Sequence, residues 1–496
     1  MIPCEDLAST AAAGPHITSA RLVPMPRNCE VTAEIPPADP DGFPIQFKVN
    51  MPLDWNRKAV HGGGSGLNGV VAPLVKGPLW EPETSPAPLF QGYATYTSDS
   101  GHDIRQFDHP AEFALNAESL ENFAGAQIGK VKSAATDIIT AFYGQAPERT
   151  YFIGYSQGGR EALVAAQRYP DAYDGIISGD PVVELASLWI SHIGAARSFL
   201  ENDRAGMITP AQQAALGQLV LAQCDPLDGI KDGRIANDYA CSPDLSALSC
   251  TAGQTSVETC LSDAQIAAVI KLKSPVAMDF PLAGKTQIAA KPWGDELIGG
   301  GAYFRAVNIG PGGDLPGIYK RMAGIIASFI AQDPGFDFAN WDWNAAHTRA
   351  RLQEVAALVG SNNPDLGAFR KTGGKLIVYG AGASNVSPGT MAGYYQDMVA
   401  EMGQATVDDF IRFYMFPNTT HDGATLPGTP RSAELLAALE AWVELGMAPG
   451  DLVNGPRPGE EASDTPTWPL CRYPTYPRYI GKGDPAVLDS YVCAAN

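Results

Sequence analysis

The residues best suited to chemistry lie in the stretch Tyr-Phe-Ile-Gly-Tyr-Ser-Gln-Gly-Gly-Arg, residues 151–160. Ser156 stands between Gly154 and Gly158, after a β-prone run and before a helix-forming segment that ends near Tyr169. A serine on a strained strand-to-helix turn exposes its hydroxyl group, and the flanking glycines avoid collisions with neighbouring elements. The helix N-terminus then points toward a developing oxyanion. The pattern therefore indicates a nucleophilic serine, and the alternative is a tight β–α turn that contains serine by chance.

A candidate general base stands far downstream of this serine. His421 follows a predicted strand at residues 410–416 and precedes a predicted helix at residues 432–445. Where a serine occupies such a turn, the chain order is serine, acid, histidine, so a histidine after the last core strand occupies the place of the base. His102 precedes the serine in an Asp-Ser-Gly-His stretch, and we interpret it as a hydrogen-bonded residue of a structural turn.

A glycine-rich loop at residues 62–66 is a candidate for oxyanion stabilisation. It follows a short predicted strand, and it lacks both the Gly-Lys-Ser/Thr of a phosphate loop and the helix of a dinucleotide site. The usual donors are the N–H of the residue after the nucleophile and one N–H from an upstream loop. We expect these donors at Gln157 and at the turn of Gly64 and Ser65, and a plain flexible loop is the alternative.

The elements around these residues alternate between strands and helices. Strands are predicted at residues 43–51, 93–98, 151–153, 174–179, 375–379 and 410–416, and helices at residues 116–142, 160–169, 391–403 and 432–445. Between about Val182 and Phe369 the sequence no longer alternates regularly between predicted strands and helices, and its composition becomes rich in glycine and proline. The sequence predicts an α/β-hydrolase fold with a large inserted lid domain, in which residues 1–181 and 371–496 form the core and residues 182–370 the lid.

Composition restricts the classes of function. The chain has 496 residues, and its 34 Lys and Arg against 54 Asp and Glu give a net charge of −20. Such an acidic protein lacks the electrostatics to bind nucleic acid or an anionic membrane. No apolar run approaches the roughly 20 residues of a membrane span. The first residues lack a basic or apolar signal region, so we interpret the sequence as a mature chain after signal-peptide removal.

The eight cysteines fall into pairs that are close in sequence. Their number is even, and their spacing matches no Cys-x-x-Cys or Cys/His metal motif. We predict the disulfides Cys4–Cys29, Cys224–Cys241, Cys250–Cys260 and Cys471–Cys493. Disulfides on this scale imply an oxidising compartment, so a secreted or periplasmic location is expected. Reduced, buried cysteines are the alternative.

One loop between the second pair has the composition of a calcium site. Asp225, Asp228 and Asp232 are spaced three to four residues apart, with glycines for sharp turns between them. Hard oxygen ligands on a compact loop suit Ca²⁺, although the register is not that of an EF-hand. The expected ligand set adds Ile230 and Ile235 to the three aspartates. An acidic turn held by a disulfide is the alternative.

These motifs, in this order, resemble the tannase and feruloyl esterase family of secreted serine esterases. The resemblance covers roughly residues 4 to 450 and rests on CEDLAS, GGGSGLNG, YTSDSGH, YFIGYSQGGREAL, YDGIISGDP, CDPLDGIKDGRI, CLSDAQIAAV and LIVYGAGASNVSP, followed by His421. It implies a lid that closes over an aromatic acyl group, a structural Ca²⁺ in the lid, no organic cofactor, and ester hydrolysis through an acyl-enzyme. The implied substrates are small-molecule esters of the feruloyl, gallate or terephthalate-monoester type.

The sequence departs from the family pattern at three positions. Tyr155 and Asp422 replace two cysteines that usually form a disulfide beneath the active site. Ala383 replaces the usual acid, and residues 380–388 contain no Asp or Glu. We propose Asp180, which ends the strand after the serine's helix, as the substitute acid in a triad with Ser156 and His421. Otherwise Asp180 only caps the turn before Pro181; Asp422 is the weaker candidate because it adjoins the histidine.

Two further alternatives stay open. Because Ala383 cannot orient an imidazole, the chain could be a catalytically impaired relative that binds aromatic esters or acids. It could also be an esterase for aliphatic or phthalate esters, since lid residues set specificity and the sequence does not reveal their contacts. Aromatic residues that line either the site or the lid core are Trp189, Trp293, Tyr303, Trp341 and Trp343.

Overall fold

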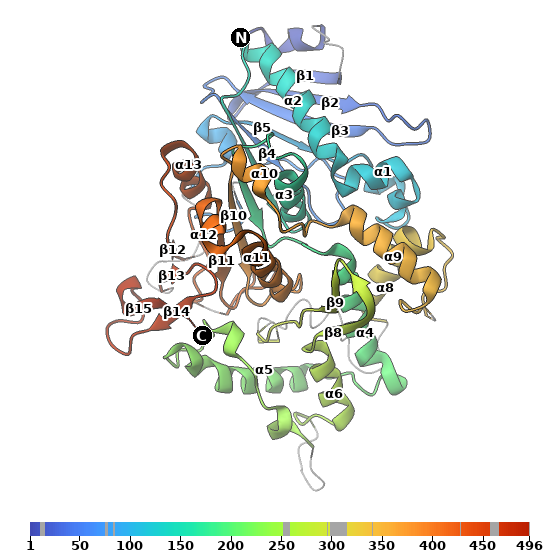
Figure 1. The fold of residues 1–496 in the computed structure, drawn as a ribbon, viewed down its shortest axis with the longest axis vertical. Coiled ribbons are helices and arrows are strands. Elements are labelled where there is room, and N and C mark those ends of the chain that lie inside the picture. The colour runs from blue at the N-terminus through green and yellow to red at the C-terminus, as the bar shows by residue number, and fades with distance from the viewer. Residues whose placement is uncertain are drawn as a thin grey trace.

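A nine-stranded mixed sheet forms the centre of the computed structural model, with strand order β1-β2-β3-β5-β4-β6-β7-β10-β11 (Figure 1). The structure describes residues 1–9, 15–74, 78–82, 85–250, 258–294, 296–297, 315–339, 341–426, 428–456 and 466–495. The strands are β1 (His16–Pro24), β2 (Arg27–Ile35), β3 (Ile45–Pro52), β4 (Lys58–Gly62), β5 (Ala94–Ser98), β6 (Arg149–Tyr155), β7 (Gly175–Gly179), β10 (Lys375–Ala381) and β11 (Ile411–Phe416).

The sheet has an antiparallel part and a parallel part. Strands β1, β2, β3 and β5 pair antiparallel, whereas β5, β4, β6, β7, β10 and β11 run parallel. Side chains of β3 alternate between buried and half-buried, whereas all residues of β7 and β11 are buried. This difference follows from covering the parallel part on both faces. The six strands predicted by residue range and the short strand predicted before the glycine loop all lie within this sheet.

Helices cover both faces of the parallel strands. On one face, α2 (Gln127–Tyr143), α3 (Gln157–Arg168) and α11 (Pro388–Met402) contribute to buried clusters with the strands. On the other face, α13 (Leu435–Leu445) packs its leucines and a tryptophan against β6, β7 and β10. A short helix before β11, α12 (Gln404–Phe410), was not predicted from the sequence; it begins directly after Gly403, whose φ is +81°.

The predicted helix at residues 116–142 is interrupted. It consists of α1 (Ala117–Glu121), a π-turn at Asn122–Ala126 and α2, with a φ of 140° at Gly125. The buried guanidinium of Arg160 binds the main-chain oxygens of the two residues before this glycine. A Cβ on Gly125 would lie 2.6 Å from a side-chain carbon of Val164 in α3. The interruption therefore results from close packing of this segment on α3.

The chain leaves the sheet after β7 and returns at β10, the neighbouring parallel strand. Most of the intervening elements lie in the lower half of Figure 1: α4 (Leu185–Arg204), α5 (Pro210–Cys224), α6 (Asp263–Leu272), β8 (Val276–Leu282), β9 (Lys285–Ile288) and α8 (Gly317–Ile325). The last two, α9 (Ala346–Val359) and α10 (Gly367–Lys371), lead back to the sheet, and α10 lies beside α3. Most of the intervening elements share one large apolar cluster with residues near Phe113 and Phe123 of the core. The division at residues 181/182 and 370/371 stays a prediction.

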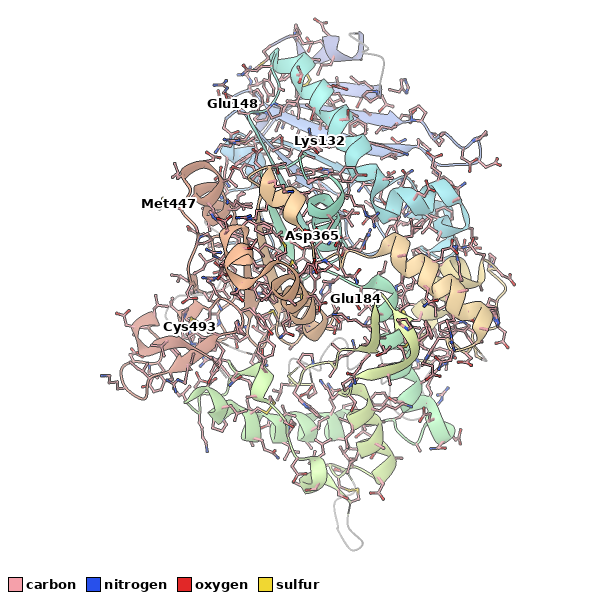
Figure 2. All side chains as sticks on the ribbon, viewed as in Figure 1. Lys132, Glu148, Glu184, Asp365, Met447 and Cys493 are labelled. Carbon is pink, nitrogen blue, oxygen red and sulfur yellow. A yellow bond between two sulfur atoms is a disulfide. The ribbon has the colours of Figure 1, made fainter. Side chains whose placement is uncertain are left out.

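The C-terminal segment carries two small antiparallel pairs, β12 (Leu452–Asn454) with β13 (Trp468–Leu470), and β14 (Tyr476–Tyr479) with β15 (Tyr491–Ala494). Cys493, labelled in Figure 2, forms a disulfide with Cys471. The other three disulfides are also those predicted from the sequence: Cys4–Cys29, Cys224–Cys241 and Cys250–Cys260. Within the described ranges, no helix is long and apolar enough to cross a membrane.

Candidate active site

Three glycines make the turn around Ser156 possible. A Cβ on Gly154 would lie 2.0 Å from the Gly158 oxygen, and one on Gly158 would lie 2.5 Å from the Gly64 oxygen. A Cβ on Gly159 would lie 2.4 Å from the Gly179 oxygen. Ser156 itself has φ +61° and ψ −118°, a strained conformation for a residue with a side chain. The turn between β6 and α3 therefore has the geometry of a nucleophile elbow.

Ser156, His421 and Asp180 form a continuous chain of hydrogen bonds. His421 Nε2 lies 2.8 Å from Ser156 Oγ, and His421 Nδ1 lies 2.5 Å from Asp180 Oδ2. The three residues follow β6, β11 and β7, respectively, so they meet at the carboxyl ends of the parallel strands. The structure thus brings together the three residues of the hypothesised triad.

The carboxylate of Asp180 is fully buried and held from several directions. Its Oδ1 accepts the Ala381 N–H at 3.1 Å, and its Oδ2 accepts the Ser384 hydroxyl at 2.7 Å. Ser384 Oγ also lies 3.5 Å from His421 Nδ1. Ser384 was not predicted as a site residue, although it lies beside Ala383 in the segment 380–388, which contains no Asp or Glu. Asp422 does not contact the imidazole, because its carboxylate accepts from the Thr420 hydroxyl and the Ala424 N–H.

Gly64 and Ser65, the two candidates for the oxyanion donor of the glycine loop, differ in availability. The Gly64 N–H donates to Glu161 Oε2 at 2.8 Å, so it is already engaged. The N–H groups of Ser65 and Gln157 make no hydrogen bond with any described residue. Gln157 is the first residue of α3, where main-chain N–H groups lack partners within the helix. Of the pair Gly64 and Ser65, the structure therefore leaves Ser65 available.

Tyr155, the last residue of β6, contacts the candidate base. Its hydroxyl donates to the His421 main-chain oxygen at 2.5 Å, and the two rings stack with centroids 5.2 Å apart. Trp80 packs edge-on against Tyr155. Burial, and next the nearby Asp180 carboxylate, raise the pKa of Tyr155 well above 10, so the hydroxyl stays a donor. Tyr155 thus links the elbow to the histidine loop, where the resembling family usually has a disulfide.

We expect Tyr155→Phe to lower kcat by about fivefold to tenfold, since one hydrogen bond that orients the histidine loop is worth about 1 kcal/mol. Tyr414→Phe is the matched control, because the Tyr414 hydroxyl donates to the Gly450 oxygen at 2.6 Å, in contact with neither Ser156 nor His421. Steady-state kinetics and melting temperatures should show a similar loss of stability in both variants but a loss of kcat only in Tyr155→Phe. Equal kcat values in the two variants would contradict the linking role.

A small cavity of about 130 Å³ opens onto Ser156 and His421. Its other walls come from the lid, the glycine loop, the start of α3 and the segment after β10: Gly66, Leu67, Gln157, Val182, Leu185, Leu188, Trp189, His192, Ile318, Arg321, Met322, Ile325, Asn385 and Val386. Burial lowers the pKa of His192 well below 6.5, so this wall residue is neutral. Of the four aromatic residues proposed from the sequence that the structure describes, Trp189 lines the cavity. Trp293, Trp341 and Trp343 belong to the lid cluster, and Tyr303 lies outside the described residues.

The acidic lid loop has oxygen donors, but each carboxylate is engaged by the loop itself. Asp225 accepts the N–H groups of Asp232 and Gly233, and Asp228 accepts those of Ile230 and Ala236. Burial and the charges of the two neighbouring aspartates raise the pKa of Asp228 to about 7. In the described part of the chain, no three His, Cys, Asp or Glu residues gather closely enough to hold a metal. The donor chemistry suits Ca²⁺, whereas the side chains are not arranged as a closed cage.

Comparisons with known proteins identify the family of this chain. The tannase and feruloyl esterase family model matches residues 29–494. An uncharacterized esterase of Agrobacterium fabrum is 31% identical over 98% of this chain and 90% of its own. The mono(2-hydroxyethyl) terephthalate hydrolase of Piscinibacter sakaiensis is 30% identical over 99% of this chain and 88% of its own.

Solved structures confirm the predicted fold class. Feruloyl esterase B from Aspergillus oryzae superposes with a TM-score of 0.85, at 22% identity and 99% coverage of both chains. A tannin acyl hydrolase from Aspergillus niger superposes with a TM-score of 0.74, at 18% identity, over 99% of this chain and 95% of its own. The chain therefore belongs to the tannase and feruloyl esterase family and is a carboxylic ester hydrolase.

Proposed function

We propose that this esterase hydrolyses esters of aromatic acids through an acyl-enzyme on Ser156. The observation that carries the proposal is the hydrogen-bond chain from Ser156 Oγ through His421 to the buried carboxylate of Asp180. A serine hydroxyl is a weak nucleophile unless an adjacent base removes its proton, and this chain supplies such a base. Asp180 supports the proposal that the absence of an acid at position 383 does not disable the enzyme.

The proposed mechanism has two halves. Ser156 Oγ attacks the ester carbonyl while His421 Nε2 takes its proton, and Asp180 stabilises the resulting imidazolium. The N–H groups of Gln157 and Ser65 donate to the oxyanion. His421 then gives the proton to the departing alcohol. In the second half, His421 removes a proton from water, which attacks the acyl-enzyme and releases the acid and free Ser156.

The cavity supports an aromatic acyl group of limited size. Its volume of about 130 Å³ is close to that of an apolar protein cavity of about 150 Å³ that holds one benzene molecule. Leu185, Trp189 and Met322 provide apolar walls. A single-ring acyl group, as in a gallate, benzoate or terephthalate monoester, matches this space better than an aliphatic chain does, because flat rings pack well against Trp and Met side chains.

A burst assay tests the proposed function. Wild-type protein and Ser156→Ala are compared with p-nitrophenyl acetate, methyl ferulate and mono(2-hydroxyethyl) terephthalate. We expect turnover of at least one aromatic ester in wild type and a decrease of about 10⁴-fold or more in Ser156→Ala. If folded wild-type protein binds these esters without turnover, the chain is an impaired relative; turnover of aliphatic or phthalate esters alone would replace the proposed substrate class.

We further propose that Asp225, Asp228, Asp232, Ile230 and Ile235 bind a structural Ca²⁺ in the lid and that the protein is secreted or periplasmic. A cation there would offset the repulsion among the three carboxylates. The four disulfides support the location.

We expect EDTA to lower the melting temperature and added Ca²⁺ to restore it, because a ligand present at 100 times its Kd stabilises the folded state by about 2.7 kcal/mol. Asp228→Asn should abolish the response to Ca²⁺. Asp244→Asn is the control: its carboxylate is exposed and caps Ser246, outside the acidic loop. Differential scanning calorimetry that shows identical curves with EDTA and with Ca²⁺ would rule out the metal site.

A further inference from the structure

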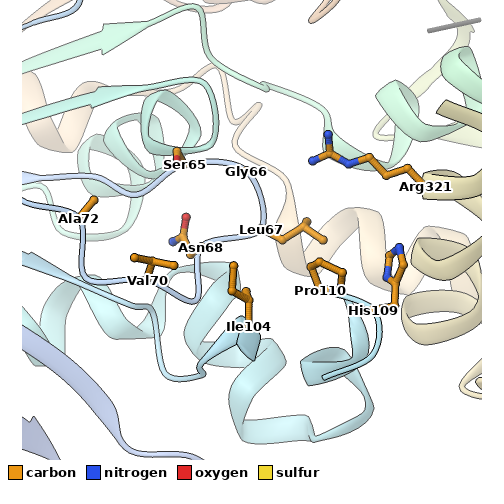
Figure 3. A pocket seen from close by; sticks show the side chains of 10 residues that line it. All are labelled: Ser65, Gly66, Leu67, Asn68, Val70, Ala72, Ile104, His109, Pro110 and Arg321. Atoms are coloured by element: carbon orange, nitrogen blue, oxygen red, sulfur yellow. The ribbon is translucent and has the colours of Figure 1, made fainter. Parts of the chain in front are cut away.

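A second cavity adjoins the catalytic one. It has a volume of about 460 Å³ and shares Gly66, Leu67 and Arg321 with the smaller cavity (Figure 3). The segment from Ser65 to Leu67, which carries the proposed oxyanion donor, therefore forms part of the wall of both. A ligand in the second cavity would lie next to an acyl group bound at Ser156.

The second cavity combines an apolar wall with two cationic or donor groups. Leu67, Val70, Ile104 and Pro110 provide apolar surface, whereas His109 and Arg321 lie on the side opposite Val70 (Figure 3). No described lining residue is acidic, and the Arg321 guanidinium forms no ion pair with any residue that the structure describes. His109 Nδ1 accepts the Ala111 N–H at 3.2 Å, so its hydrogen is carried on Nε2. The Glu112 carboxylate lies near His109, so Arg321 supplies the positive charge and His109 an N–H donor, a combination that favours a ligand with oxygen acceptors or negative charge.

We propose that this cavity is a subsite for the distal part of an extended aromatic ester, with Arg321 where the two cavities meet and His109 binding a carboxylate or ester oxygen of the distal part. The subsite rests on the proposed ester hydrolysis at Ser156. An acyl group larger than one ring exceeds the catalytic cavity, and the shared wall at Gly66, Leu67 and Arg321 is where it would continue. The predicted ligand class is therefore a two-ring acid ester with an oxygen acceptor on the second ring.

Three methyl esters separate the effect of the second ring from the effect of the distal carboxylate. They are methyl benzoate, methyl para-phenylbenzoate, and the monomethyl ester of para,para′-biphenyl dicarboxylic acid. Val70→Trp should fill the cavity and lower kcat/KM for both two-ring esters by about tenfold or more, while methyl benzoate is unaffected. His109→Asn should reduce kcat/KM only for the carboxylated ester. Val453→Trp, on β12, is the control, because Val453 and Val70 are 53% and 51% exposed.

The results with the three esters distinguish a wrong subsite from a wrong proposed function. If wild type hydrolyses methyl benzoate but prefers neither two-ring ester, or if Val70→Trp affects all three substrates equally, the subsite is wrong. If wild type hydrolyses none of the three esters, the proposed ester hydrolysis at Ser156 is contradicted, and with it the subsite. A crystal structure with the biphenyl acid bound provides a second measurement that does not depend on turnover.

A separate observation concerns the buried carboxylate beneath the glycine loop. Glu161, on α3, is 1% exposed and accepts the Gly64 N–H at 2.8 Å through Oε2 and the Asn68 side-chain N–H through Oε1. The far end of the loop is fixed elsewhere: Leu67 O lies 2.9 Å from His102 Nε2, and the Gly69 N–H donates to Asp99 O. Ser65 stands between the two residues that Glu161 holds.

We infer that Glu161 is a positioning residue that aims the Ser65 N–H at the oxyanion. Glu161→Leu removes both acceptors, so the loop loses its attachment to α3. Glu161→Gln keeps one acceptor, and the Asn68 amide can reverse to accept from the new amide, because Asn68 Oδ1 has no partner now. The glutamine variant should therefore behave much like wild type.

Binding of a trifluoromethyl ketone, whose serine adduct carries an oxyanion, tests this role against binding of the product acid, which lacks one. Glu161→Leu should lower both the affinity for the ketone and kcat by about tenfold or more, while the affinity for the product acid stays unchanged. Glu161→Gln should restore the affinity for the ketone and kcat. Glu81→Leu removes another carboxylate that accepts a main-chain N–H, that of Leu436, and should leave both ligands unaffected. Asn68→Ser, which removes one of the two bonds, should show a smaller change in the same direction if the leucine variant does not fold. If Glu161→Leu lowers the affinities for the ketone and for the product acid equally, the assignment is wrong. If the leucine variant does not fold, the same result in Asn68→Ser would overturn it.

Discussion

Asp180→Asn is expected to lower kcat by about 10⁴-fold, the loss seen when an asparagine replaces the acid of a serine triad. An amide at this position would donate to His421 Nδ1 and so place the imidazole hydrogen on Nε2, where it cannot accept the proton of Ser156. The asparagine oxygen can still accept the Ala381 N–H, and the Ser384 hydroxyl can change from donor to acceptor. The variant should therefore fold while losing turnover.

Asp422→Asn is the matched control for this experiment. It makes the same chemical change one residue from His421, but its carboxylate contacts Thr420 and Ala424 instead of the imidazole. Its kcat should stay within about twofold of wild type, as expected for a surface substitution without a catalytic contact. Pre-steady-state kinetics on both variants, with circular dichroism to confirm folding, make the comparison. Near wild-type turnover in Asp180→Asn would remove Asp180 from the triad.

Arg160→Met should destabilise the protein by about 3–5 kcal/mol, because it breaks a fully buried, charged hydrogen-bond network. The Arg160 side chain is 0% exposed and donates to the main-chain oxygens of Phe123, Ala124 and Val359. These carbonyls belong to the π-turn before α2 and to the last residue of α9, so one guanidinium joins α3 to the core helix and to the lid. Burial lowers the pKa of Arg160 to about 10, which leaves it charged at neutral pH.

Arg168→Met provides a control with the same change on the same helix. The Arg168 side chain also donates to carbonyls of this region, at Ala124, Leu358 and Gly360, but it is exposed. Water can replace its hydrogen bonds, so the expected loss is about 1 kcal/mol or less. Chemical denaturation of both variants measures the difference in the free energy of unfolding. If the free energy of unfolding decreases by a similar amount in both variants, the buried hydrogen bonds of Arg160 stabilise the protein no more than the exposed ones of Arg168.

The strained elbow explains why Ser156 could be identified without a structure. Its signal is local: a strand, glycines two residues either side of the serine, and a helix. The disulfides were predictable for a similar reason, since each joins cysteines at most 25 residues apart. The position of His421 required only the order of elements along the chain. Each of these features depends on neighbouring residues or on sequence order, both of which the sequence contains.

Other features depended on how distant segments meet. Whether Asp180 reaches His421 depends on the parallel register of β7, β10 and β11, which hydrogen bonds between strands far apart in sequence define. The contact of Tyr155 with the His421 carbonyl and the bridge by Ser384 have the same origin. The glycine loop shows the limit most clearly. Its composition predicted one donor from the turn of Gly64 and Ser65 without deciding between them, but a buried carboxylate almost 100 residues away takes the Gly64 N–H and leaves the Ser65 N–H available. The sequence by itself determined the candidate nucleophile, the order of the candidate site residues and the covalent links, whereas only tertiary packing decided which polar groups are paired and which remain available to a substrate.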